Sequence, residues 1–153
     1  MPQSEGLGMM QKDNRTIAFV CTGNTCRSSM AEAIFNDMAE KNGVRVRAES
    51  FGIATSTGLP VSENSVIVCK EIGIDLSGKA STAVADAGIE KYEKFYCMSQ
   101  SHAKMLMQFF LVQPEKIAVL GISDPYGGDI EVYRHCRDEI VNSVKEILKA
   151  YEN

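Results

Sequence analysis

Apolar and polar positions along the chain alternate between short strand-like runs and stretches with helical periodicity. The strand-like runs are rich in β-branched and aromatic residues and have the length of buried or half-buried strands. They occupy residues 17–20, 44–48, 95–98 and 117–120. Because strands and helices alternate throughout, the pattern predicts a single-domain α/β fold. We expect a four-stranded, twisted parallel sheet with right-handed crossovers and helices on both faces.

The helices are predicted from apolar residues three and four positions apart. After the first strand, Met30, Ala31, Ile34 and Met38 have this spacing and predict the first helix. Gly43 is suited to end that helix in a left-handed conformation. Further helices are expected from a cap at Ser62 to Gly73, over residues 82–91, from a cap at Ser101 through residue 110, and over residues 130–151. The inward positions of the second helix are Val66, Val68, Cys69 and Ile72, and those of the last are Tyr133, Cys136, Ile140, Val144, Ile147 and Tyr151.

The loop between the first strand and the first helix, Cys21-Thr-Gly-Asn-Thr-Cys-Arg-Ser28, carries the strongest chemical signal. Its backbone N–H groups would converge beside a helix N-terminus, where partial positive charge favours an anion. We therefore expect a phosphate-binding loop after strand 1. Its phosphate-binding residues are expected to be Thr22, Gly23, Asn24, Thr25, Cys26, Arg27 and Ser28.

Two side chains of this loop, Cys21 and Arg27, indicate that it would carry out chemistry on a phosphoryl group. The converging N–H groups and Arg27 would stabilise a thiolate at Cys21 and make its sulfur nucleophilic. Arg27 can grip two phosphoryl oxygens with its planar guanidinium, and Ser28 can donate a hydrogen bond to the sulfur. A Cys and an Arg at this spacing also occur by chance, but the strand before them and the helix after them favour the catalytic interpretation.

A second group of polar residues, Ser123-Asp-Pro-Tyr-Gly-Gly128, follows the fourth strand. The loop is expected to bend back over the carboxyl edge of the sheet and bring Asp124 beside the phosphate loop. There a carboxyl group can act as general acid and then as general base, whereas the alternative is an aspartate that only closes a turn. Tyr126 is expected to form an aromatic wall beside the substrate, and a buried structural tyrosine is the alternative.

Charge and composition narrow the function. The 153 residues carry a net charge of −4, so no nucleic-acid partner is expected. No apolar run has the length of a membrane span and no signal peptide is evident, so we expect a cytoplasmic protein with no membrane partner. The five cysteines include no C-x-x-C pair and are expected to be reduced thiols, and no metal or other cofactor is expected. Residues 1–14 are expected to be a disordered leader or a cloning remnant, which leaves residues 15–153 as the domain.

With Met30-Ala-Glu32 behind it and Asp124-Pro-Tyr126 downstream, the loop resembles that of the low-molecular-weight protein tyrosine phosphatase family. The resemblance runs from about residue 16 to the C-terminus and implies a cysteine-dependent, metal-free phosphatase on a four-stranded parallel sheet. It implies phosphorylated proteins or peptides as partners, and inorganic phosphate or similar oxyanions as ligands of the loop. Family members often place a basic residue near Lys79, which suggests a contact at the rim of the site.

The substrate prediction depends mainly on Thr25. Most tyrosine-specific family members have a bulky aliphatic residue there, whereas threonine is smaller and offers a hydroxyl to a polar substrate. In this respect, and in Asp-Pro-Tyr-Gly-Gly, the chain resembles the bacterial protein arginine phosphatases, which favours phosphoarginine, with phosphotyrosine as the alternative. Ser29 and Phe51 depart from the common family motifs. Arsenate reduction is a remote alternative, because it needs relay cysteines and no second cysteine follows Cys97 closely.

Two further side chains are candidates for chemistry. Cys26 is expected to form a disulfide with Cys21 under peroxide and so protect the nucleophile, and a small buried residue that supports the loop is the alternative. His102 falls in the first turn of the helix predicted after the third strand. We expect a surface histidine there rather than a catalytic partner of Cys21, because Arg27 and the loop amides already account for thiolate activation. The sequence does not fix the oligomeric state.

Overall fold

The sheet is confirmed as predicted in strand number and direction. The computed structural model describes residues 15–152, and the expected leader at residues 1–14 lies outside the described residues. Within this range, four parallel strands are hydrogen-bonded in the order β2-β1-β3-β4. They are β1 (Thr16–Cys21), β2 (Arg47–Gly52), β3 (Lys94–Cys97) and β4 (Ile117–Val119). The two central strands are therefore β1 and β3.

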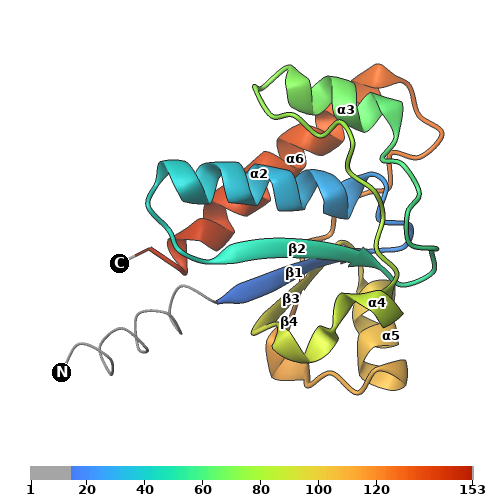
Figure 1. The fold of residues 1–153 in the computed structure, drawn as a ribbon, viewed down its shortest axis with the longest axis vertical. Coiled ribbons are helices and arrows are strands. Elements are labelled where there is room, and N and C mark those ends of the chain that lie inside the picture. Colours follow the sequence, from blue (N-terminus) through green and yellow to red (C-terminus); the bar gives the residue numbers. More distant parts are fainter. Residues whose placement is uncertain (1–14, 153) are drawn as a thin grey trace.

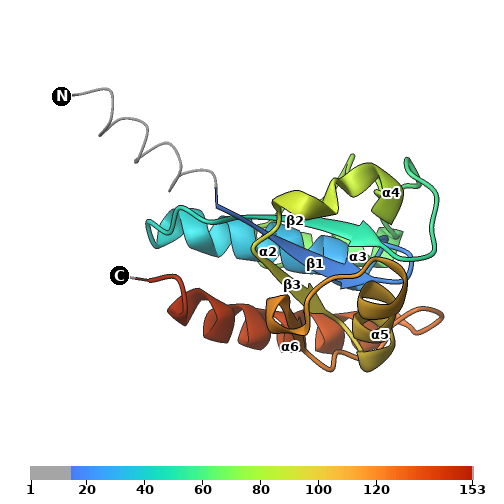
Figure 2. The same cartoon turned by 90° about the horizontal axis from the view of Figure 1, so that it is seen from below.

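Helices cover both faces of the sheet (Figure 1). One face carries α2 (Arg27–Lys41), α3 (Glu63–Lys70) and α6 (Ile130–Lys149), and the other carries α4 (Val84–Ala87) and α5 (Gln100–Phe109). Both views show α2 and α6 running alongside each other (Figures 1 and 2), and they pack together. Two short 3-10 helices, η1 (Ile89–Lys91) and η2 (Pro114–Lys116), precede β3 and β4. In the described part of the chain, no helix has both the length and the apolar character that a membrane crossing requires.

The core has two parts because successive residues of a strand point to opposite faces. In β1, Ile17 and Phe19 pack on the side of α2 and α6, while Ala18 and Val20 pack on the side of α4 and α5. All four side chains are fully buried. Cys21 continues the same alternation and lies in the first cluster, which explains why the strand delivers its sulfur to the side on which α2 begins.

Two sequence predictions of element bounds are wrong. The second strand, expected at residues 44–48, begins at Arg47 and runs to Gly52, because its pairing register with β1 extends from Thr16–Arg47 to Cys21–Gly52. The helix expected over residues 82–91 is split into α4 and η1 by Gly88, whose φ of 70° is incompatible with a continuous right-handed helix.

Smaller corrections concern helix ends. Ser62 caps α3 as expected by accepting a hydrogen bond from Ser65 N at 3.3 Å. Ile72, predicted to point inward, is 39% exposed because α3 ends before it at Lys70. The helix after β3 is capped at Ser99 and not at Ser101, which changes the environment of His102. The α6 helix ends at Lys149, two residues earlier than predicted.

The carboxyl ends of the strands meet at one edge of the sheet, where parallel α/β proteins bind ligands. Here β1 leads directly into the predicted phosphate loop, and Gly52 at the end of β2 lies against it. A side-chain carbon at position 52 would lie only 2.6 Å from the Thr22 carbonyl oxygen. A glycine is thus required where the second strand passes the loop.

Candidate active site

Cys21 occupies the last position of β1, and its sulfur is enclosed by the loop that follows. The side chain is only 3% exposed. The Asn24 N–H donates to the sulfur at 3.1 Å, and the Ser28 hydroxyl lies 2.7 Å from it. Hydrogen bonds to a charged group favour that charged form. The structure therefore places two hydrogen-bonding groups, one of them the Ser28 hydroxyl, against the sulfur of Cys21.

The loop can turn back on the sulfur because Asn24 adopts a left-handed conformation with φ of 59°. Asparagine tolerates this region better than most residues. Its side chain is fully buried: Nδ2 donates to Ser28 Oγ at 2.8 Å and to Ser50 Oγ at 2.9 Å, and Oδ1 accepts from Thr82 N at 2.8 Å. Since Ser28 Oγ accepts from Asn24, its own proton is left to point at the sulfur of Cys21.

A row of polar groups behind the loop continues this network. Ser50 Oγ donates to Glu32 Oε1 at 2.6 Å, and Glu32 Oε2 pairs with Lys79 Nζ at 3.0 Å. The sequence analysis identified Glu32 only as part of a motif and expected Lys79 at the rim of the site. In the structure Lys79 instead holds Glu32, and through it Ser50, so it supports the loop from behind.

Arg27 is the first residue of α2, and its guanidinium is nearly buried. Nη1 donates to the carbonyl oxygen of Ile122 at 2.9 Å, which ties the loop after β4 to the start of α2. Nη2 lies 3.7 Å from Asp124 Oδ2. The other carboxylate oxygen, Oδ1, accepts from Tyr126 N at 3.1 Å. Asp124 therefore closes a turn, as one interpretation predicted, and also presents an oxygen toward Arg27.

The loop after β1 and the loop after β4 border one cavity of about 230 Å³. Its lining contains every residue of the predicted loop from Cys21 to Arg27, together with Asp124 and Tyr126. Asp124 is 54% exposed in its side chain, and Tyr126 is 83% exposed, so the interpretation of Tyr126 as a buried structural residue is wrong. The geometry brings a thiol, a guanidinium and a solvent-facing carboxylate to one small hollow.

His102 is the site residue that sequence reasoning misjudged. It is only 4% exposed and not on the surface. Nε2 lies 2.9 Å from Thr22 Oγ1, and Nδ1 accepts from Ser99 N at 3.1 Å. Burial, with a smaller contribution from the charge of Arg27, lowers the pKa of His102 to about 4, against an opposing effect of Asp124. The useful signal was Ser99, three residues before His102 at the spacing of a capping box.

Cys26 is buried beside the loop and contacts neighbours from two other segments. Its sulfur lies 3.5 Å from Ser62 Oγ and 3.6 Å from Tyr133 OH. Burial and the contact with Cys26 raise the pKa of Tyr133 to about 12. Thr25 Oγ1 is 3.9 Å from the same sulfur, in the lining of the cavity. Cys26 therefore supports the loop, whatever its redox chemistry.

The other cysteines are poor nucleophiles. Cys69, Cys97 and Cys136 are buried, and burial raises the pKa of each thiol to about 12. The core positions predicted for Cys69 and Cys136 are confirmed.

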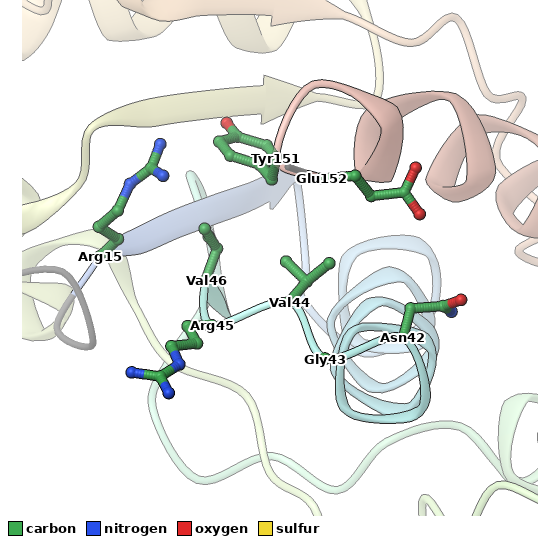
Figure 3. A pocket seen from close by; sticks show the side chains of 8 residues that line it. All are labelled: Arg15, Asn42, Gly43, Val44, Arg45, Val46, Tyr151 and Glu152. Carbon is green, nitrogen blue, oxygen red and sulfur yellow. The ribbon is translucent and has the colours of Figure 1, made fainter.

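Two further hollows differ from the candidate site. One of about 510 Å³ adjoins it beyond Arg27 and Asp124, between the end of β4 and the start of α5. The other, of about 610 Å³, lies near Arg15, at the opposite end of β1 from Cys21 (Figure 3). There Arg15 makes two hydrogen bonds with Glu93, at 2.9 and 2.8 Å, and lies 5.2 Å from the ring centroid of Tyr151. Arg15 is thus already engaged within the protein.

Comparisons with known proteins identify relatives along most of the chain. Residues 16–153 match the family model described as low molecular weight phosphotyrosine protein phosphatase. A protein-arginine-phosphatase of Geobacillus stearothermophilus is 35% identical over 142 residues, which cover 87% of this chain and 93% of the relative. The low molecular weight protein-tyrosine-phosphatase YfkJ of Bacillus subtilis is 30% identical, over 72% of this chain and 80% of the relative.

A solved structure is similar in fold as well. It is described as a mutant of YwlE arginine phosphatase with a phosphorylated active site serine. It superimposes with a TM-score of 0.83 at 30% identity, covering 88% of this chain and 94% of the solved chain.

Proposed function

The chain belongs to the low-molecular-weight phosphotyrosine protein phosphatase family, and on that premise we propose that it hydrolyses phosphoarginine in proteins through a cysteinyl-phosphate intermediate on Cys21. The observation that carries the substrate assignment is the position of Thr25. Its side chain lines the same cavity as Cys21 and Asp124. A small hydroxyl-bearing residue there suits a polar guanidinium better than an aromatic ring.

In the first step the Cys21 thiolate attacks phosphorus. A bond between sulfur and phosphorus forms, the bond between phosphorus and the arginine nitrogen breaks, and Asp124 gives its proton to that nitrogen. The guanidinium of Arg27 and the loop amides hold the phosphoryl oxygens, where charge builds up in the transition state. The exposed carboxylate of Asp124 also attracts the cationic guanidinium that leaves.

In the second step a water molecule attacks the thiophosphate. Asp124, now ionised, takes a proton from the water, a new bond between oxygen and phosphorus forms, and the bond to sulfur breaks. The thiolate is released toward the Asn24 N–H at 3.1 Å and the Ser28 hydroxyl at 2.7 Å. Inorganic phosphate leaves, and the site returns to its starting state.

Several relationships support this assignment. The Geobacillus relative is named an arginine phosphatase, and the similar solved structure carries a phosphoryl group on its active site serine. Phosphotyrosine is the second candidate, favoured by the exposed ring of Tyr126 at the rim and by the relative named a tyrosine phosphatase. The full burial of Cys97 speaks against a redox relay of the kind that arsenate reduction requires.

The test compares kcat/KM on phosphoarginine and phosphotyrosine peptides of one sequence. We expect wild type to prefer phosphoarginine, and Thr25→Ile to shift the ratio toward phosphotyrosine by at least about tenfold, or about 1.4 kcal/mol. Thr25→Val is the matched control, because it removes the hydroxyl and adds little bulk. Cys21→Ser and Asp124→Asn should lower turnover of both peptides. An unchanged ratio in Thr25→Ile would remove Thr25 as the selector.

A further inference from the structure

The mechanism above gives no role to the buried imidazole of His102, which lies beside the loop. His102 lies in the first turn of α5, which covers the sheet face opposite α2, yet its imidazole reaches Thr22, the residue after the nucleophile. A buried polar group of this kind is costly unless its hydrogen bonds are specific. The contact joins the start of α5 to the start of the phosphate loop.

The hydrogen-bond partners define which nitrogen carries the proton. Nδ1 of His102 accepts from the backbone N–H of Ser99 at 3.1 Å, so it must be unprotonated. The proton of the neutral ring therefore lies on Nε2 and is donated to Thr22 Oγ1 at 2.9 Å. Because Oγ1 accepts this bond, the hydroxyl proton of Thr22 stays free to donate into the cavity that Thr22 lines.

Thr22 is held from two sides. Its carbonyl oxygen accepts from Ala54 N at 3.0 Å, beyond the end of β2, and its hydroxyl accepts from His102 on the other side. Two residues later, the Asn24 N–H must point at the sulfur of Cys21. A change in the orientation of Thr22 would therefore be passed directly to the amides that are expected to hold the phosphoryl group.

We propose that His102 is a positioning residue for the phosphate loop, acting through its Nε2–H donated to Thr22, and that it works as a neutral imidazole. The inference rests on the proposed function, since it assigns His102 a part in the same site. Neutrality matters because a protonated ring would lose the Ser99 N–H contact and place a second cation beside Arg27. The lowered pKa of His102 agrees with this requirement.

The experiment uses substitutions that separate the two ring nitrogens. His102→Gln can place an amide donor near the Nε2 position, whereas His102→Asn reaches only as far as Nδ1. Thr22→Val removes the accepting hydroxyl and keeps the shape of the side chain. His135→Gln is the matched control, because it changes the exposed histidine of α6. Each variant is assayed for kcat and KM on a phosphoarginine peptide, for inhibition by inorganic phosphate, and for thermal unfolding.

We expect His102→Asn and Thr22→Val each to lower kcat/KM and weaken phosphate inhibition by about tenfold, with Tm within a few degrees of wild type. The double variant should be no worse than Thr22→Val alone, because the loss of the Thr22 hydroxyl already removes the bond that His102→Asn removes. His102→Gln should recover most of the loss, and His135→Gln should match wild type. Normal phosphate inhibition in His102→Asn, or a silent Thr22→Val, would overturn the inference.

A second measurement distinguishes a failure of the proposed phosphatase function from a failure of the role of His102. Phosphate protection of Cys21 from alkylation by iodoacetamide reports on the loop without any phosphorylated substrate. If wild type shows neither turnover nor phosphate protection, the phosphatase assignment fails. If wild type shows both and His102→Asn is unchanged, only the role of His102 fails.

Discussion

Lowering the pH should destabilise the protein through His102 in a way that can be calculated. The pKa of His102 is about 4 in the folded protein, against an ordinary value of 6.5. Between these two values the unfolded chain binds a proton that the folded protein does not, so folding stability falls as the pH decreases through this window. Between pH 7.5 and pH 5.0 the loss amounts to about 2 kcal/mol, and below pH 4 it stops growing.

The charged groups nearest the ring explain the direction. Arg27 at the start of α2 opposes a charge on His102, and Asp124 in the loop after β4 favours one, but burial dominates both effects. The lowered pKa therefore reflects the position of the ring under the loop. A surface imidazole, as the sequence analysis expected, would give no such loss.

The assay is urea unfolding of wild type, His102→Gln and His135→Gln at pH 7.5, 6.5 and 5.0. Carboxylates titrate in all three proteins, so the informative quantity is the difference between wild type and His102→Gln. From pH 7.5 to pH 5.0, the free energy of unfolding of wild type should fall by about 2 kcal/mol more than that of His102→Gln. His135→Gln leaves His102 in place and should keep the wild-type loss. A difference that does not change with pH would refute the argument that the buried ring is neutral.

Two further predictions concern other parts of the chain. Leu111, just after α5, has φ of 57° and is 81% exposed. Leu111→Gly should relieve the strain of this left-handed conformation and raise the free energy of unfolding by about 1 kcal/mol. Urea titrations measure this change, and a loss of stability would contradict the prediction. Peroxide should join Cys21 to Cys26 in a disulfide, with the peroxide reduced to water, and dithiol should restore activity. Cys26→Ser should instead lose activity irreversibly, and wild type that dithiol cannot rescue would count against the protective role.

The central part of the site could be predicted from the sequence because its signals are local. A buried strand, a polar loop with Cys21 and Arg27, and an amphipathic helix follow one another without interruption. Asp124 could be predicted for a related reason: the carboxyl ends of parallel strands meet at one edge, so a loop after the fourth strand reaches the loop after the first. The topology of the sheet is therefore enough to predict that the two loops lie close together.

The remainder of the site depends on contacts that the sequence does not show. Asn24 meets Ser50 and Thr82, which lie 26 and 58 residues away along the chain. His102 was expected on the surface because Arg27 and the loop amides already account for thiolate activation. Its contact with Thr22, 80 residues away along the chain, buries it instead. The end of β2 was misplaced because pairing with β1, and not local alternation, sets the length of that strand. In each case a tertiary contact outweighed a local preference.

The arrangement of these contacts holds the loop in one conformation, which suits the oxyanion binding that we propose for it. A left-handed Asn24 is a strained conformation, worth of the order of 1 kcal/mol or more. It is held by hydrogen bonds with α2, β2 and the segment before α4, and Thr22 is held by His102 and Ala54. Loop amides fixed in this way need not reorganise as charge develops on the phosphoryl group, which is the condition under which such donors are most effective. Asp124, by contrast, stands exposed on a turn at the rim, where the proposed reaction needs a proton donor that meets both the leaving group and the incoming water.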